Sequence, residues 1–272
     1  MRHLSIISIL AAAAGILAAS CHDAQPVVPQ NTIVDNCGVI TRMDTTQNKV
    51  YLVFTAHFSL SDNGAFENFD GIVPVLDVLK AQGVKGSFFP TGECFRVEKY
   101  AEPLRRIINE GHYLSAHSDK HLLLCAEGDH SINLVAPDSL ATDIAGMEAE
   151  LNSLGLQKKD YFWMIPPYET YNQSSADALR ALGYRLITST PGIRTGADWA
   201  AEGSRGFVSG DVMLDSIWSF EEEYTLNGVI LLIHAMHYPL RQDADRIYTR
   251  LEEIITGIRA RGYTFGSFKE FV

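Results

Sequence analysis

Short apolar runs typical of buried strands alternate with helix-forming segments along most of this 272-residue chain. The first run, residues 49–55, is almost wholly apolar, as expected of a strand that is buried on both faces. Apolar residues at helical spacing follow in 72–79, and the alternation continues to residue 265. This pattern predicts an α/β fold with a parallel sheet or a closed β/α barrel. In such folds functional side chains gather at the carboxyl ends of the strands.

The remaining expected elements follow the same logic of apolar runs and glycine stops. We predict further strands at 86–89, 161–165, 185–188 and 229–233. One predicted helix ends at Gly111, and three others cover 144–154, 174–182 and 244–261.

The first twenty residues have the composition of a targeting signal. A short basic start precedes an apolar run that is too short to span a membrane comfortably and that ends in small residues before Cys21. We predict that residues 1–20 are a signal resembling those of bacterial lipoproteins and that Cys21 is lipidated. The chain would then be extracytoplasmic, anchored in the periplasm or at the cell surface. Ordinary cleavage after Ser20 is the alternative, because Ala18 stands where such signals usually carry a larger aliphatic residue.

Beyond the signal, residues 21–45 are polar and lack periodicity, which predicts a tether and irregular lead-in. Residues 46–272 are enough for one domain with a sizeable core. The formal net charge of −11 without any basic run argues against nucleic acid and against direct binding to anionic membranes, so we expect membrane contact only through the lipid. We expect a monomer. Three cysteines besides Cys21 allow one disulfide, for which Cys94 and Cys125 are the favoured pair.

His117 and His121 are four residues apart, just after the segment that ends at Gly111-His112. On a helical turn they would share one face and could bind one metal ion. Two ordinary histidines are the alternative, since spacing alone is weak evidence.

The order of motifs resembles the polysaccharide deacetylases, the NodB-like enzymes of carbohydrate esterase family 4. The resemblance covers residues 49–271 and rests on these segments: Lys85-Gly86-Ser87-Phe88-Phe89 with Gly92, Gly111-His112, His117 with His121, Pro166-Pro167-Tyr168, Asp198-Trp199, Leu232-Ile233-His234 and Arg261-Gly262-Tyr263-Thr264-Phe265. It implies a distorted (β/α)7 barrel that removes acetyl groups from a glycan. It also implies one divalent metal, usually zinc with nickel or cobalt as alternatives, bound by His117 and His121. His234 would be the general acid, and the backbone N–H of Tyr168 would stabilise the oxyanion.

The chain departs from this family at three motifs. The family's first strand ends in two aspartates, a base and a metal ligand, where we expect Ala56 and His57. Ile165 replaces the arginine that orients the base, and Thr195 replaces the first aspartate of the fourth motif, which tunes the acid histidine. We therefore predict a metal site of three histidines, His57, His117 and His121, which is a ligand set that zinc accepts.

Other side chains are candidates for the roles left open. Glu169, Asp62 and Asp119 are possible replacement bases, with a solvated loop position as the alternative for each. His237 could replace His234 as the acid. Aromatic faces suit sugar rings, so Tyr168 and Trp199 are candidate substrate contacts, whereas we expect Trp163 to pack in the core. Two functions remain open: a metal-dependent glycan deacetylase, or a catalytically degenerate relative that binds carbohydrate.

Overall fold

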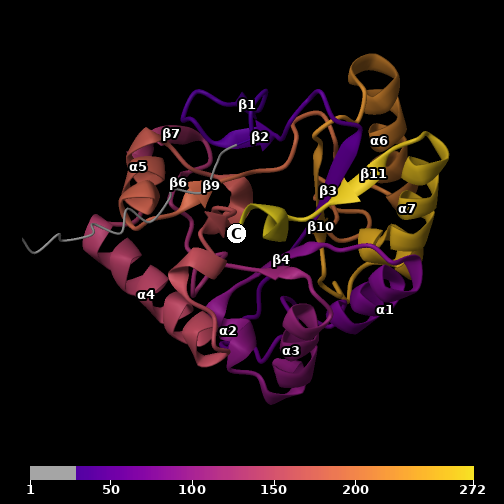
Figure 1. The fold of residues 1–272 in the computed structure, drawn as a ribbon. Helices are drawn as coiled ribbons and strands as arrows, with labels where there is room; N and C mark the ends of the chain where they lie inside the picture. The colour runs from indigo at the N-terminus through magenta and orange to yellow at the C-terminus, as the bar shows by residue number, and fades with distance from the viewer. Residues whose placement is uncertain (1–28) are drawn as a thin grey trace, which may run out of the picture.

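The structure, a computed structural model, describes residues 29–272 (Figure 1). The predicted signal and Cys21 lie outside the described residues. The strands are β1 (Ile33–Val34), β2 (Ile40–Arg42), β3 (Lys49–Ala56), β4 (Ser87–Pro90), β5 (Tyr113–Leu114), β6 (Cys125–Ala126), β7 (Asp129–Asn133), β8 (Trp163–Met164), β9 (Arg185–Leu186), β10 (Ile230–His234) and β11 (Thr264–Gly266). The helices are α1 (Ile72–Gln82), α2 (Gly92–Phe95), α3 (Ala101–Asn109), α4 (Pro137–Ser153), α5 (Gln173–Ala181), α6 (Gly210–Tyr224) and α7 (Leu251–Ala260).

The strands form a ring, with the helices around its outside (Figure 1). The longest strand, β3, lies inside a parallel sheet of order β10-β3-β4-β5, and β11 also pairs with β3. Single bridges continue the ring: Ala116–Met164 joins the end of β5 to β8, Ile40–Ile187 joins β9 to β2, and Arg42–Val229 joins β2 to β10. The closed β/α arrangement expected from the sequence is thus confirmed.

Successive residues of β3 face opposite sides of the ring wall. Val50, Leu52, Phe54 and Ala56 belong to the outer core, between the strands and the helices. Tyr51 and Val53 belong to the inner core, inside the ring. Because both sides are apolar, this strand has no visible hydrophobic alternation in the sequence.

The inner core is closed at one end by the C-terminal turn, residues 268–271, which lies over the middle of the ring in Figure 1. Phe268 is fully buried there, with its ring centroid 5.1 Å from that of Trp163. Trp163 is itself fully buried, so the prediction of core packing for this residue is confirmed. The opposite end of the ring, at the carboxyl ends of the strands, remains open for a site.

Several elements differ from the expectation. Part of the predicted lead-in is structured, because β1 and β2 pair and Val39 and Met43 are fully buried. The helix α6 and the β6–β7 hairpin were not predicted, and the last helix is shorter than the expected 244–261 because two 3-10 turns precede α7.

The three cysteines between residues 29 and 272 are all free thiols, so the predicted Cys94–Cys125 disulfide is wrong. Cys94 is fully buried on α2 beside Thr91, whereas Cys125 begins the β6–β7 hairpin. Burial raises the pKa of the Cys94 thiol to about 12, which makes it unreactive. Within the described range, no helix combines the length and the apolar character needed to cross a bilayer.

Candidate active site

A cleft of about 660 Å³ opens at the carboxyl ends of β3 and β10. It contains all three predicted metal histidines and the predicted acid, His234. Its lining residues are Thr55, His57, Phe66, Glu67, His117, His121, Glu127, Tyr168, Glu169, Ser189, Ile193, Arg194, Gly196, Ala197, Trp199, Leu232, His234 and Tyr238. Residues that are up to 183 positions apart in the sequence therefore meet in one cavity.

His117 and His121 reach this cleft from an irregular turn, so the helical turn assumed from their spacing is wrong. Ser118 and His121 both have positive φ, 70° and 54°, which no α-helix of L-residues accommodates. The turn nevertheless places the two imidazole centroids 5.0 Å apart.

Two neighbouring helices hold that turn in place. Asp143 of α4 is buried and accepts hydrogen bonds from the Ser118 hydroxyl at 2.6 Å and from the backbone N–H groups of Asp119 and Lys120 at 2.8 and 3.0 Å. At the start of α2, Gly92 lies so close to the turn that a Cβ there would be 2.0 Å from Asp119 Oδ1. The predicted Gly92 motif therefore serves close packing against the histidine turn.

We expect Asp143→Ala to lower the free energy of unfolding by about 2–4 kcal/mol, because it leaves three donors without their acceptor, two of them buried. Urea denaturation followed by circular dichroism measures this. Thr142→Ala on the same helix is the control, since its hydroxyl bonds only to the helix carbonyl of Asp138. Equal losses in the two variants would contradict a specific clamp on the histidine turn.

The three histidines are held neutral, the state in which imidazole binds a metal. Burial lowers the pKa of His117 to about 3, and burial followed by the charges of the neighbouring histidines lowers the pKa of His121. Burial also lowers the pKa of His57, against an opposing effect of Glu67. His117 Nδ1 lies 2.7 Å from the carbonyl oxygen of Ile165. Because a carbonyl only accepts, Nδ1 carries the hydrogen and Nε2 keeps its lone pair.

The donor set fits a divalent metal in kind but is not arranged around one point. Three neutral imidazoles suit zinc, and the Nδ1 of His121 is buried without a hydrogen-bond partner in the described chain. However, the rings of His57 and His121 are stacked, with centroids 3.9 Å apart and planes 15° apart, so their nitrogen lone pairs lie in nearly parallel, separate planes. Among residues 29–272, no three His, Cys, Asp or Glu side chains are placed to hold a metal ion as they stand. Coordination by all three histidines needs at least one ring to rotate.

His234, at the end of β10, forms a partly buried pair with Asp198. Its Nδ1 lies 2.6 Å from Asp198 Oδ1, and Asp198 is fully buried. Burial lowers the His234 pKa, but the charge and hydrogen bond of Asp198 outweigh this effect and raise it overall. The expectation that His234 lost its tuning carboxylate with Thr195 is therefore wrong. His237 instead contacts the Tyr248 hydroxyl at 2.9 Å and does not line the cleft.

The cleft-facing position at the end of β3 is Thr55 rather than Ala56. Thr55 lines the cleft, and its buried hydroxyl has no partner in the described chain, whereas Ala56 packs in the outer core. The assignment of the missing base to Ala56 is therefore wrong, because strand alternation turns that side chain away. His57, one residue beyond the strand, does face the cleft. Ile165 is fully buried in the inner core.

The candidate bases are not free in the cleft. Glu169 lines it, but both carboxylate oxygens accept hydrogen bonds, from Thr188 and from the Ser189 backbone and hydroxyl. Asp119 does not line the cleft and is paired with Arg96 at 2.5 Å. Asp62 lies on the exposed loop after β3. Sequence reasoning missed Glu67, whose Oε2 lies 2.7 Å from His57 Nδ1.

Aromatic side chains form the exposed rim of the cleft. Tyr168 is 49% exposed and Trp199 is 54% exposed, as expected of substrate contacts, and Phe66 adds a third exposed ring. The Tyr168 ring centroid lies 4.2 Å from that of His121, so the rim continues directly into the histidine cluster.

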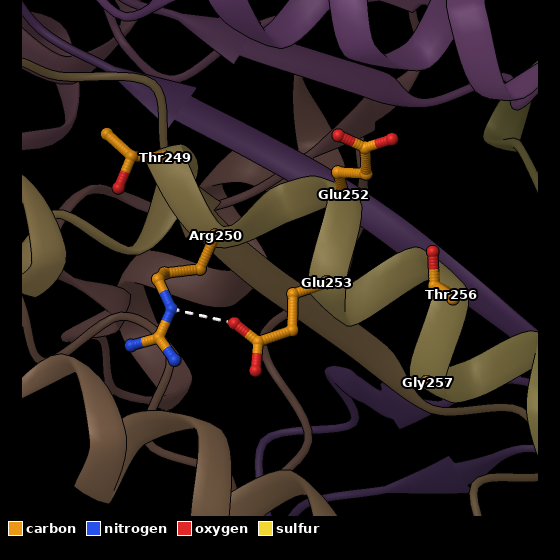
Figure 2. A pocket seen from close by; sticks show the side chains of 6 residues that line it. All are labelled: Thr249, Arg250, Glu252, Glu253, Thr256 and Gly257. Carbon is orange, nitrogen blue, oxygen red and sulfur yellow. Dashed lines mark hydrogen bonds and ion pairs between the residues drawn. The ribbon is translucent and has the colours of Figure 1, made fainter.

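A separate groove lies along α7, lined by Thr249, Arg250, Glu252, Glu253, Thr256 and Gly257 (Figure 2). Its polar side chains include an Arg250–Glu253 pair at 2.8 Å. None of the sequence-predicted site residues lies in it.

The chain is similar to proteins of known activity. A family model described as polysaccharide deacetylase matches residues 44–187. The peptidoglycan-N-acetylmuramic acid deacetylase PdaA of Bacillus subtilis is 25% identical over 244 residues, which cover 89% of this chain and 78% of that protein. A chitin deacetylase of Pestalotiopsis sp is 25% identical and covers 91% of this chain and 69% of its own length.

Solved structures show the same fold. The structure of Bacillus subtilis PdaA, a family 4 carbohydrate esterase, superposes with a TM-score of 0.63 at 21% identity and covers 86% of this chain and 85% of its own. A CE4 family pseudoenzyme from Bacillus anthracis gives a TM-score of 0.63 at 16% identity and covers 85% and 68%. The NodB-type barrel predicted from the motifs is thereby confirmed.

Proposed function

Because the chain belongs to the polysaccharide deacetylase family, we propose that it is a metal-dependent hydrolase that removes N- or O-linked acetyl groups from a glycan. One observation carries this proposal: His234, backed by the buried Asp198, faces the same cleft as His57, His117 and His121. A proton donor and a set of neutral metal-type ligands are the two components that acetyl hydrolysis needs here.

The reaction is a hydrolysis in which water adds to the acetyl carbonyl and the bond to the sugar nitrogen or oxygen breaks. A divalent metal, when bound, supplies polarisation of the carbonyl and lowers the pKa of water. His234 gives its Nε2 proton to the departing nitrogen or oxygen, so that an amine or alcohol leaves. Asp198 accepts the Nδ1 hydrogen bond and raises the His234 pKa against the opposing effect of burial, and this favours the protonated imidazole.

The end of β3 offers no carboxylate base, since Thr55 holds its last cleft-facing position, and the candidate base Glu169 is fully hydrogen-bonded. The exposed rings of Tyr168 and Trp199 are positioned to stack on sugar rings beside the histidines.

A degenerate carbohydrate-binding protein is the second candidate function. The observation that favours it is the same missing carboxylate, together with histidine rings that are stacked rather than convergent. The fold is also found in a protein described as a pseudoenzyme.

Acetate release from N-acetylated and O-acetylated glycans tests the proposal. We expect purified protein to release acetate from at least one glycan when zinc is added. Acetate release should stop in EDTA and recover when zinc is restored. Retention of a glycan without acetate release, in protein that holds zinc, would instead support the binding function.

The extracytoplasmic lipoprotein anchor predicted from residues 1–21 remains a proposal. It is consistent with a polymeric glycan substrate outside the cell.

A further inference from the structure

Glu67 is the one carboxylate that the structure places against a candidate metal histidine within residues 29–272. It belongs to the loop between β3 and α1, ten positions after His57. Its Oε2 lies 2.7 Å from His57 Nδ1, close in distance although not aligned as a regular hydrogen bond. The His57 side chain is 10% exposed and that of Glu67 is 33% exposed.

Hydrogen bonds at Glu67 and at the next residue anchor the loop that carries this carboxylate. The Glu67 carbonyl accepts a hydrogen bond from Ser59 N–H, and the neighbouring Asn68 is buried and bonds to the backbone of His237 at 2.9 Å. The carboxylate is therefore presented to His57 from an anchored position rather than from a free side chain.

The chemistry of the pair determines which nitrogen of His57 is available. At 2.7 Å two lone pairs would repel and a carboxylate oxygen only accepts, so Nδ1 carries the hydrogen and Nε2 keeps its lone pair. A carboxylate behind a histidine also adds negative charge to a site whose three ligands are all neutral. His117 has the corresponding arrangement with the carbonyl of Ile165.

We propose that Glu67 is a positioning residue for His57, which sets its tautomer and supplies the negative charge that a three-histidine metal site lacks. The inference rests on the proposed metal-dependent function and extends it to a residue outside the family motifs. It predicts that Glu67 contributes to metal affinity through His57 and not through its charge alone.

Zinc affinity of the purified protein, measured by competition with a chromophoric chelator, tests this proposal. We expect Glu67→Gln to weaken zinc binding about 10–100-fold, the usual effect of removing such a partner. Glu127→Gln is the matched control: it removes the same charge from the same cleft, and in the described chain Glu127 pairs with no histidine. We expect less than about threefold weakening there. Adding Glu67→Gln to His57→Ala should weaken binding no further than His57→Ala alone.

The outcomes separate this inference from the proposed function. Wild-type affinity in Glu67→Gln, an equal loss in Glu127→Gln, or no zinc binding by the wild type would overturn the role of Glu67. Acetate release with unchanged affinity in Glu67→Gln would leave the function standing without this inference. Affinities in the expected order, without acetate release from any glycan, would leave Glu67 positioned for metal binding and the deacetylase function wrong.

Discussion

Replacing His234 by alanine is expected to lower the rate of acetate release about 10²–10⁴-fold, the usual contribution of a general acid. The leaving nitrogen or oxygen then has to depart without a proton from the protein. Zinc content should be unchanged, because His234 is held by Asp198 and is not one of the three proposed ligands. Acetate release per bound zinc measures the effect, and a loss below about threefold would contradict the acid role.

Asp198→Asn provides the pH test of the same assignment. Asp198 raises the His234 pKa against the opposing effect of burial, so the protonated acid persists to higher pH. Activity that needs this proton is present below the His234 pKa and is lost as pH rises through it. The amide lowers that pKa, so the alkaline limb of kcat should move to lower pH. An unmoved limb would mean that another group donates the proton.

The second large effect concerns two adjacent residues of β3. Ala56→Asp places a carboxylate in the fully buried outer core, and we expect it to lower the free energy of unfolding by about 3–5 kcal/mol. Thr55→Asp places the same group in the cleft, and we expect the fold to be retained. Urea denaturation of both variants gives the comparison. Similar stability of the two would contradict the side-chain directions on β3.

Acetate release by Thr55→Asp tests whether the cleft works without a carboxylate base. Ile165 offers no charged partner for the new aspartate, and a nearby metal would hold its carboxylate fully ionised, which makes it a poor base. We therefore expect a change of less than about tenfold. A gain of about 10²-fold or more would show that the absence of a base limits the natural protein.

The arrangement of strands was largely predictable, because buried runs such as 49–55 and 229–233 have few alternatives in a chain of this length. The helix α6 was missed, although Ser209 is a readable N-cap whose hydroxyl accepts the Val212 N–H. The β6–β7 hairpin gave no signal, since all five residues of β7 are exposed and mostly polar. Its position is set by contacts such as that of Asn172 with His130.

The sequence predicted which histidines share the cleft, but not the directions of the neighbouring side chains or the partners of the histidines. Motif order brought His57, His117, His121 and His234 to one cleft, as the structure confirms. The sequence did not show which side chains at the end of β3 point into the cleft. An apolar strand buried on both faces conceals whether residue 55 or 56 points into the cleft.

The partners of the histidines were also hidden, because they come from irregular loops. Asp198 and Glu67 meet His234 and His57 through loop conformations that have no periodicity to read. Asp143 was concealed for a different reason: it lies on α4 just before the predicted helix 144–154, and a polar residue at such a position is normally taken as solvent-exposed.

The zinc content of His121→Ala compared with His234→Ala tests the central claim most directly. The His121 ring lies between those of His57 and Tyr168, and its buried Nδ1 has no partner in the described chain. The comparison is matched, because each variant removes one imidazole from the same cleft. We predict about one zinc per chain in the wild type and in His234→Ala, and a clear loss in His121→Ala. Equal loss of zinc in the two variants would contradict the division of the cleft into metal ligands and proton donor.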